Sequence, residues 1–286
     1  MKKRQITIKD IAKALHISPS TVSRSLADHP DISQETKNIV NAYAREHKYK
    51  PNALALSLRT NNTKTIGVIL PQIVHYFFSS VLSGIEDEAE KGGYRVIICQ
   101  SNENYEKEVK GAQALLEARV CGVLASVAKT TTIYNHFQEL IDSDIPMVFF
   151  DRICTGILTD RVVVDDYAGV CSAVEYLIRS GCRRIAFFGS PSHLAISNNR
   201  RMGYEDALRK NGLPVDKELI KICDNYTEAL RLTPELLSLP NRPDAFFAVN
   251  DETAIGVLNV VKAKGLRIPD EVSICGFTTV SYTHLR

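Results

Sequence analysis

The fold of the N-terminal part is decided by residues 7–24, T-I-K-D-I-A-K-A-L-H-I-S-P-S-T-V-S-R. Thr7 and Asp10 have the spacing of a helix N-cap and its reciprocal partner at the third helical position. The apolar residues that follow recur at i, i+3, i+4 and i+7 and are Ile8, Ile11, Ala12 and Leu15. This periodicity predicts a short amphipathic helix with one buried stripe. A tight turn at residues 16–17 then ends it.

A second helix is predicted to begin at Pro19. Ser18 is a favoured N-cap residue, and a proline at the first helical position loses no hydrogen bond. Val22 and Leu26 give this helix a buried side. The other side carries polar and small residues related by i, i+3 and i+4 spacing: Pro19, Ser20, Ser23 and Arg24. Two short helices joined by a tight turn are typical of a helix-turn-helix, and small hydroxyls beside an arginine suit a DNA groove.

Charge is distributed unevenly along the chain. The 286 residues carry a formal net charge of +2. Residues 1–64 hold 12 Lys and Arg against 5 Asp and Glu, a net charge of +7, whereas the remainder holds 23 against 28, a net charge of −5. A basic module on an acidic body indicates a polyanionic partner for the N-terminal part.

Composition and motifs exclude several classes of protein. An apolar content of 44% and a charged content of 24% are those of a soluble globular protein. Because there is no signal-peptide pattern and no run of about 18 apolar residues, we expect a cytoplasmic protein without a membrane partner. The seven cysteines are scattered without a C-x-x-C pair, so we expect neither a metal site nor a cofactor. No nucleophile-elbow, P-loop or H-E-x-x-H motif is present, and we expect no enzyme.

A third helix and a linker complete the N-terminal part. Ser33 is a suitable N-cap for a helix that ends near His47, with Ile39, Val40, Tyr43 and Ala44 predicted to face inward. After the break at Lys50-Pro51, residues 52–59 offer a helix of about two turns, which is marginal by itself in water. The predicted boundaries are 1–50 for the helix-turn-helix domain and 51–64 for this helix and a polar linker.

From residue 65 onward, apolar runs alternate with amphipathic helices. The predicted strands are residues 65–70, 94–99, 122–125 and 146–150, then 162–165, 184–189, 219–223, 245–249 and 272–277. This alternation predicts an α/β domain of doubly wound parallel sheets with helices on both faces. We expect two lobes, at about 65–160 and 161–286. Ligands of such sheets bind beyond the carboxyl ends of the strands, so the cleft between the lobes is the expected site.

An ordered set of motifs resembles the lactose-repressor (LacI/GalR) family of bacterial transcription regulators. The motifs are T-I-x-D-I-A, S-x-x-T-V-S-R, D-I-S-Q-E-T, Y-x-P-N and T-I-G-V-I-L-P. The resemblance covers nearly the whole chain. It implies an all-α helix-turn-helix headpiece followed by a two-lobed α/β effector domain like the periplasmic sugar-binding proteins.

The resemblance also implies the residues that bind DNA. The second helix would enter the major groove with Pro19, Ser20 and Arg24 at base-contacting positions, and the Arg24 guanidinium is able to bond guanine O6 and N7 together. Thr21 and Ser23 suit phosphates, which position the helix without reading sequence. The full predicted set is Thr7, Ser18, Pro19, Ser20, Thr21, Ser23, Arg24, Asn52, Ala53, Leu58 and Arg59. The alternative is that the residues of the second helix are ordinary solvated side chains of a small helical domain.

Residues 52–59 would be the hinge helix of the resembled family. Such a helix folds on DNA, pairs with its twofold mate and inserts Leu58 into a minor-groove step, which kinks the duplex. Arg59 would lie close to the same groove. The alternative is that Leu54 and Leu58 pack on the third helix.

Polar residues at the predicted strand ends are the candidates for the effector site. In the resembled family, the positions of Arg200 and Asp251 hold a sugar or nucleobase by charge-assisted hydrogen bonds. Aromatic rings are suited to stack on such a ligand, and Asp151 or Asp165 is suited to accept from it. The predicted set is Tyr76, Phe77, Asp151, Arg200, Tyr226 and Asp251. Two alternatives stay open: Asp251 as a helix cap, and Phe77 as a core residue.

The C-terminal residues depart from the family pattern. An aspartate usually follows the aromatic residue of the last strand, whereas Thr278 follows Phe277 here, and residues 280–286 match nothing in the pattern. The family's chain continues further, completing the first lobe and part of the dimer face. We therefore expect a truncated or frame-disrupted chain, with an incomplete first lobe and impaired dimerisation.

The sequence as a whole predicts a homodimeric repressor of carbohydrate-utilisation genes. It would bind a palindromic operator in double-stranded DNA and respond to a small sugar-type effector between the lobes. One alternative is a catabolite-control-type regulator whose body binds a phosphorylated carrier protein. A sugar-binding receptor without a regulatory role would require export, and an enzyme would require a converging acid/base or nucleophile set that the sequence does not offer.

Overall fold

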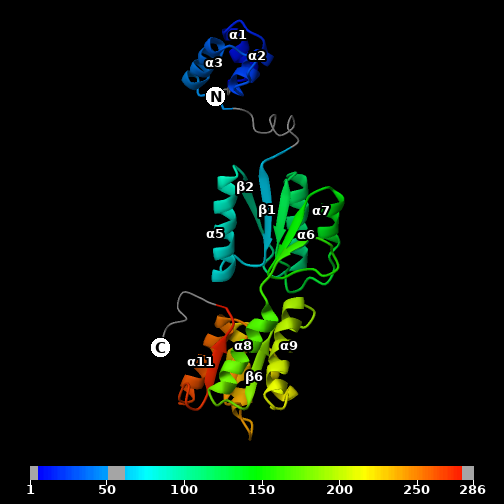
Figure 1. Ribbon diagram of the computed structural model, residues 1–286, viewed down its shortest axis with the longest axis vertical. Coiled ribbons are helices and arrows are strands. Elements are labelled where there is room, and N and C mark those ends of the chain that lie inside the picture. The colour runs from blue at the N-terminus through cyan, green and yellow to red at the C-terminus, as the bar shows by residue number, and fades with distance from the viewer. Residues whose placement is uncertain (1–5, 51–61, 279–286) are drawn as a thin grey trace. The chain divides into compact units, whose positions relative to one another are not determined.

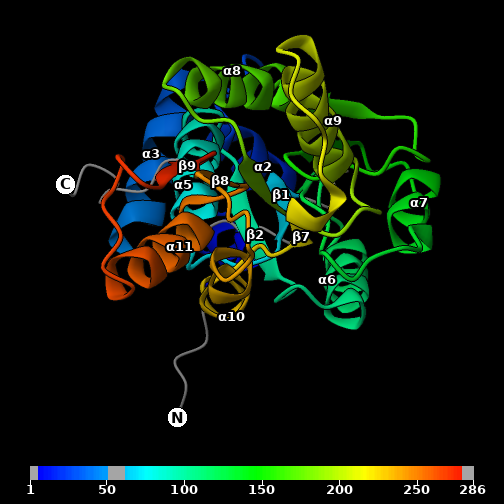
Figure 2. The ribbon, with the colours of Figure 1, turned by 90° about the horizontal axis from the view of Figure 1, so that it is seen from below.

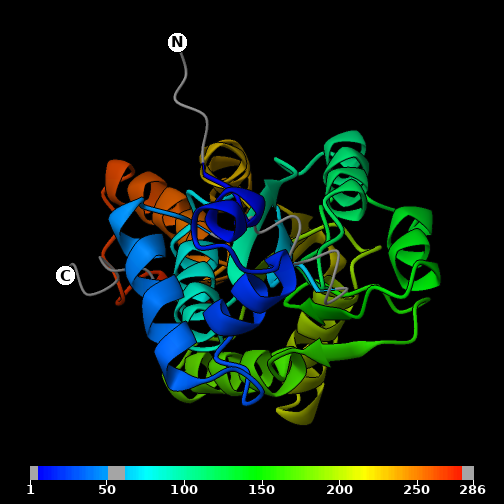
Figure 3. The same ribbon diagram turned by 90° about the horizontal axis from the view of Figure 1, so that it is seen from above.

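The computed structural model describes residues 6–50 and 62–278, which belong to two compact units, Met1–Thr63 and Lys64–Arg286 (Figure 1). We call these units the headpiece and the body. The described part of the headpiece contains three helices, blue in Figure 3: α1 (Ile8–Ala14), α2 (Pro19–Leu26) and α3 (Gln34–Glu46). Their apolar sides meet in one small core formed by Ile11, Ala12, Val22, Val40 and Ala44. The three predicted helices are therefore confirmed.

One predicted core residue of α3 is wrong. Ile39 is 51% exposed, whereas Lys37, which no apolar pattern selects, is buried. Lys37, Val40 and Ala44 follow one another on one helix face, and Ile39 lies about 100° around the helix from Val40. The Lys37 ammonium leaves the core to form an ion pair with Asp28 at 2.8 Å, and its hydrogen bond and charge lower the pKa of that carboxyl. A lysine stem thus fills the place expected for isoleucine.

The first lobe of the body is a five-stranded parallel sheet with the strand order β2-β1-β3-β4-β5. Helix α5 (Tyr76–Lys91) covers one face through Val68 and Leu70. The opposite face packs through Ile69 against α6 (Tyr105–Glu117) and α7 (Asn135–Asp142). The strands are β1 (Thr65–Leu70), β2 (Arg95–Gln100), β3 (Gly122–Ala125), β4 (Met147–Phe150) and β5 (Asp160–Val162).

The second lobe is a four-stranded parallel sheet with the order β7-β6-β8-β9. Phe187 and Phe247 point to the face covered by α8 (Asp166–Arg179) and α9 (Ala195–Lys210), and Phe188 and Phe246 point to the other. Figure 2 shows the sheet between these two helices and the opposite pair, α10 (Tyr226–Leu237) and α11 (Asp251–Ala263). The strands are β6 (Ile185–Gly189), β7 (Ile220–Ile222), β8 (Ala245–Ala248) and β9 (Ser273–Gly276), and a 3₁₀ turn (Lys217–Leu219) precedes β7. The predicted parallel α/β architecture is therefore confirmed.

The strand predicted at residues 162–165 is assigned to the wrong lobe. The observed strand, β5, pairs with β4, so it belongs to the first sheet. The run Val162–Val164, which reads as a buried strand of the second lobe, is mostly exposed. An apolar run shows that a strand is possible, but its sheet depends on which neighbour it pairs with.

The strand order of each sheet reverses at one place. The reversal lies between β1 and β3 in the first lobe and between β6 and β8 in the second. In parallel sheets, ligands bind at the carboxyl ends of the strands beside such a reversal. Four loops leave the sheets there, at residues 71–75 and 126–131 in the first lobe and at residues 190–194 and 249–250 in the second.

Candidate functional site

Helix α2 is fixed by local contacts. The Ser18 hydroxyl accepts a hydrogen bond from the Thr21 amide at 3.0 Å and lies 2.7 Å from the Ser20 hydroxyl. In α1, the Thr7 hydroxyl accepts from the Asp10 amide, and the Asp10 carboxylate accepts from the Thr7 amide at 2.9 Å. Both predicted N-caps are confirmed, and each satisfies backbone donors that the helix leaves unpaired.

The two sides of α2 differ as predicted. Val22 and Ser25 are buried against the headpiece core. Ser18, Pro19, Ser20 and Arg24 are exposed, and Thr21 and Ser23 are half-buried. A convex helix with hydroxyls and a guanidinium on its outer side is able to lie in the major groove, where base edges present acceptors.

Arg24 keeps most of its guanidinium available. Its Nη1 lies 3.9 Å from Asp31 Oδ2, and its side chain is 57% exposed. Such a surface ion pair contributes little stability, because water and salt screen it. A stronger acceptor can therefore replace Asp31 at low cost. The predicted hinge residues Asn52, Ala53, Leu58 and Arg59 lie outside the described residues.

In the second lobe, Arg200 is buried and bound by protein groups. Its Nε donates to Asp166 Oδ1 at 2.8 Å, its Nη1 donates to the Val249 carbonyl at 3.0 Å, and the guanidinium lies 4.3 Å from the centre of the Phe277 ring. Burial raises the pKa of Asp166, while the Arg200 charge lowers it. The arginine is thus preorganised, held at three sides beside the carboxyl end of β8.

Asp251 begins α11 and lies close to the last strand. The N-cap is Asn250, whose side chain accepts from the Thr253 amide at 2.8 Å, so the predicted alternative of Asp251 as the cap is wrong. A Cβ on Gly276 would come within 2.0 Å of Asp251 Oδ1, so glycine is required for this approach. The Asp251 amide donates to the Thr278 hydroxyl at 3.4 Å. Asp251 is therefore placed beside β9.

Asp151 of the first lobe is affected by charges of the second lobe. It follows β4 with a left-handed backbone, at φ 57°. Burial raises the pKa of Asp151, the charges of Arg152 and Arg200 lower it, and the charge of Asp166 raises it. The charges of Arg200 and Asp166 in the second lobe therefore act on Asp151 in the first lobe. Of the predicted ligand residues, Asp151 follows β4 and Asp251 follows β8 closely, while Arg200 on α9 reaches the end of β8 through the Val249 carbonyl.

The aromatic candidates are divided. Tyr76 and Phe77 begin α5 and are 50% and 38% exposed, so Phe77 is not a core residue, although its ring packs edge-on against Phe78. Tyr226 begins α10, but its hydroxyl accepts from Asn259, about two turns into α11. The Tyr226 hydroxyl therefore points away from the strand ends. Asp165 is the N-cap of α8, and its side chain accepts a hydrogen bond from the Ala168 amide at 2.9 Å.

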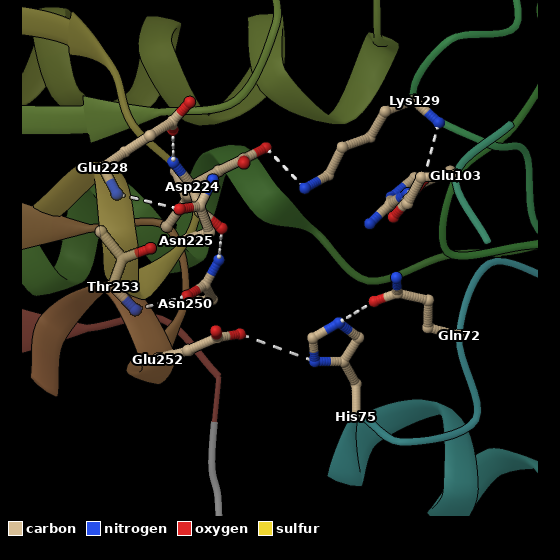
Figure 4. Close-up of polar contacts among 12 residues, drawn as sticks. Gln72, His75, Glu103, Lys129, Asp224, Asn225, Glu228, Asn250, Glu252 and Thr253 are labelled. Atoms are coloured by element: carbon tan, nitrogen blue, oxygen red, sulfur yellow. Dashed lines mark hydrogen bonds and ion pairs between the residues drawn. The ribbon is translucent and has the colours of Figure 1, made fainter. Parts of the chain in front are cut away.

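Polar contacts join the two lobes at the loops of the strand-order reversals (Figure 4). Lys129 Nζ lies 2.9 Å from Asp224 Oδ2, and His193 Nε2 donates to the Lys129 carbonyl at 2.6 Å. His75 Nδ1 lies 3.7 Å from Glu252 Oε2. We call this region, where the strand ends of the two lobes face each other, the interlobe junction.

Several residues of the interlobe junction were not selected from the sequence, among them Asp166, Phe277, Lys129 and Asp224. Asp166 stands next to the candidate Asp165, and only one of two adjacent carboxylates is able to cap the helix. Lys129 and Asp224 follow predicted strands, so the rule that polar residues after strands bind ligands would have included them. Their partners, however, come from distant parts of the chain. Within residues 6–50 and 62–278, no group of three His, Cys, Asp or Glu side chains is arranged to hold a metal ion, and no helix is long and apolar enough to cross a membrane.

Comparison with protein families identifies both units. Residues 7–52 match the family described as bacterial regulatory proteins, lacI family. Residues 63–286 match the family described as periplasmic binding proteins and sugar binding domain of LacI family. The chain belongs to the LacI family. This LacI-family protein is a transcription regulator with a DNA-binding headpiece and an effector-binding body, as its sequence predicts.

Individual relatives agree with the family. The chain is 31% identical over 278 residues to the HTH-type transcriptional repressor PurR of Vibrio atlanticus (strain LGP32), covering 96% of this chain and 82% of the relative. It is also 31% identical to Catabolite control protein A of Priestia megaterium, covering 95% and 82%. The lac repressor dimer bound to operator and the anti-inducer ONPF has the same fold, with a TM-score of 0.82, 22% identity, and coverage of 96% and 82%.

Proposed function

We propose that this LacI-family protein is a homodimeric repressor of carbohydrate-utilisation genes, which binds a palindromic operator and responds to a sugar-type effector at the interlobe junction. The observation that carries the proposal is the exposed polar side of α2 in an N-terminal part, residues 1–64, of net charge +7. A basic surface attracts the phosphate backbone, and an exposed helix face is required for reading bases. The proposed division of the chain is 1–50 for operator binding, 51–64 for the hinge, and 65–286 for effector binding and dimerisation.

Within the headpiece, we assign base contacts to Pro19, Ser20 and Arg24, and phosphate contacts to Thr21 and Ser23. Thr7 and Ser18 cap the two helices and place their amide groups toward the DNA backbone, as helix N-termini do for anions. The proposed hinge contacts come from Asn52, Ala53, Leu58 and Arg59. Phosphate contacts set affinity and salt dependence, whereas Arg24 sets preference for one base pair.

Within the body, Arg200 and Asp251 are the proposed centre of the effector site, with Asp151 facing them. Arg200 uses Nε and Nη1 for protein groups, and its Nη2 donates to no described residue. Three of the five N–H donors, one on Nη1 and two on Nη2, are therefore left for a hydroxyl or carbonyl oxygen of the effector. Carboxylates such as Asp151 and Asp251 accept from sugar hydroxyls, and Tyr76 and Phe77 offer exposed rings. Tyr226 is a weaker proposal, since its hydroxyl is bound to Asn259.

Two measurements test this function. Selection from a pool of randomised duplex DNA, followed by fluorescence anisotropy, is expected to yield a palindrome with one half-site for each recognition helix. A thermal-shift screen with neutral sugars, nucleosides and sugar phosphates is expected to identify an effector. Because coupling is reciprocal, that effector must change operator affinity by the same factor by which operator changes effector affinity.

Two results would contradict the proposal. The absence of any enriched DNA sequence would reject operator binding. A sugar that stabilises the protein while leaving operator affinity unchanged would instead support a sugar-binding receptor without a regulatory role.

A second candidate function is favoured by the similarity to Catabolite control protein A. In this alternative the body binds a phosphorylated carrier protein, and the sugar acts only indirectly. Calorimetry with phosphorylated and unphosphorylated carrier protein distinguishes the two. In either case we propose that the protein acts in the cytoplasm, where bacterial DNA is present, and performs no catalysis.

A further inference from the structure

Lys129 joins the two lobes through two different groups. Its ammonium lies 2.9 Å from Oδ2 of Asp224, which follows β7 of the second lobe (Figure 4). Its carbonyl accepts from His193, which follows β6, at 2.6 Å. Both contacts leave from one loop after β3 of the first lobe. A single residue is thus fixed to two separate strand ends of the opposite lobe.

The Lys129–Asp224 pair is more deeply buried than the His75–Glu252 contact, which also joins the two lobes. The Asp224 side chain is 8% exposed and that of Lys129 is 26% exposed, whereas His75 and Glu252 are 42% and 43% exposed and 3.7 Å apart. Water screens the second pair strongly and the first pair weakly. The ammonium approaches Asp224 Oδ2 without the geometry of a hydrogen bond, so the contact is an ion pair. Separating the lobes at this contact would remove the Lys129 counter-charge from the Asp224 carboxylate, which would then have to be stabilised by water.

Asp224 is held rigidly by its own lobe. Its amide donates to Glu228 Oε2 at 3.2 Å, and its carbonyl accepts from Asn250 Nδ2 at 2.9 Å. Asn250 is also the N-cap of α11, which places Asp251. The acidic partner of Lys129 is therefore connected to the proposed effector residues of the second lobe.

Lys129 is connected in the same way to the first lobe. Its amide donates to Glu103 Oε2 at 2.7 Å, and the same carboxylate accepts two bonds from Arg152 Nη1, at 2.8 Å and 2.9 Å. Arg152 Nε lies 3.9 Å from Asp151 Oδ2. A series of polar contacts thus runs from Asp151 through Arg152 and Glu103 to the Lys129 amide, and from the Lys129 ammonium across the junction to Asp224.

We propose that Lys129 is the positioning residue that fixes the two lobes relative to each other, and that Arg152 and Glu103 couple it to Asp151. The fixing of the lobes stands on the geometry of the body alone. Its consequence for regulation rests on the proposed function: an effector that displaces Arg152 from Asp151 also shifts Glu103, and so changes the Lys129–Asp224 contact. The two arrangements of the lobes then differ by a defined, breakable contact, as a two-state response requires.

The test measures the distance between the lobes in the full chain. Spin-labelled noncanonical amino acids at Glu139 of α7 and Lys262 of α11, both exposed, avoid the native cysteines. Double electron–electron resonance is then recorded for the parent, Lys129→Met, Asp224→Asn and the double variant. Each single variant is expected to shift or broaden the distance distribution. The double variant is expected to add nothing to either, since both changes break one contact.

Two control variants sharpen the result. Lys129→Arg retains charge and reach and is expected to keep the parent distribution. Lys91→Met makes the same chemical change in an exposed ion pair within the first lobe, where Lys91 Nζ lies 2.6 Å from Glu88, and is expected to have no effect. Circular dichroism verifies that each variant is folded.

A parent-like distribution for folded Lys129→Met would overturn the proposal, and so would additive effects in the double variant. These measurements use neither DNA nor effector, so they are independent of the proposed function. A protein that shows the distance change but binds no selected operator would contradict the repressor function and support the positioning role of Lys129.

Discussion

Helix α2 and the interlobe junction hold their proposed functional side chains in opposite ways. On α2 the side chains are exposed, and the contacts that fix them, such as Ser18 with Thr21, span three residues. In the junction, Arg200 and Asp224 are buried, and Arg200 is bound to Asp166 and Val249, distant along the chain. A change on α2 therefore affects the partner that binds there, whereas a change in the junction affects the stability and arrangement of the body as well.

The largest expected effect is a loss of stability in Arg200→Met. Removing one member of a buried ion pair leaves Asp166 without a counter-charge, which costs about 3–5 kcal/mol. Urea unfolding followed by far-UV circular dichroism measures this loss. The double variant Asp166→Asn/Arg200→Met is expected to recover part of it. A loss below about 1 kcal/mol in the single variant would show that water screens the Arg200–Asp166 pair. The junction side chains would then contribute no more to stability than the exposed side chains of α2.

Arg24→Ala is expected to produce the opposite pattern. Discrimination at one operator position is expected to fall by about 1–3 kcal/mol, because the variant cannot make the proposed bidentate contact to guanine. The free energy of unfolding changes by less than about 0.5 kcal/mol, as for other exposed substitutions. Fluorescence anisotropy with single-base operator variants measures the first quantity. Arg45→Ala on α3 removes the same charge from another exposed position and is the matched control; equal loss of discrimination in both would reject the assigned role of Arg24.

The smallest expected effect is a change in the pH dependence of stability in Asp151→Asn. Burial raises the pKa of Asp151 in the folded state, so the folded protein binds its proton more tightly than the unfolded chain. The ionised carboxylate therefore lowers stability above the folded pKa, and this penalty is relieved as pH falls through it. Asp151→Asn is expected to raise the melting temperature near pH 7, and this gain is expected to shrink toward about pH 4.

The control for this prediction is Asp87→Asn, an exposed carboxylate on α5 of the same lobe. It is expected to leave the pH profile unchanged. The groups whose charges act on Asp151 are Arg152, Arg200 and Asp166, and a hydroxyl from Ser126 lies 3.5 Å away. If Asp151→Asn instead lowers stability at neutral pH, the polar contacts of the Asp151 carboxylate stabilise it more than its burial destabilises it. Asp151 would then resemble Arg200 and Asp224, which are held by several protein groups.

Local sequence determined the headpiece almost completely. The features that define α1 and α2 are local: the N-caps Thr7 and Ser18, Pro19 at the start of α2, and the periodic placement of Ile11 in α1 and Val22 in α2. Each acts within one or two helical turns, so the sequence pattern is sufficient to predict the helix geometry. The alternation of strands and helices likewise determined two parallel sheets. The exception in the headpiece, Ile39, shows the limit, because hydrophobicity does not reveal that a lysine stem is able to fill the core position.

Tertiary structure alone decided the pairings. Residues 160–162 belong to the first sheet because their backbone pairs with β4. The sequence of this run does not specify which strand it pairs with. The sequence predicted Arg200 and Asp151 as site residues, but not Asp166, Lys129 or Asp224. The ion pairs Arg200–Asp166 and Lys129–Asp224 each join residues that are distant along the chain, and only folding brings them together. Periodicity carries information over a few residues, whereas the electrostatic environment of a buried group is set by every chain segment that surrounds it.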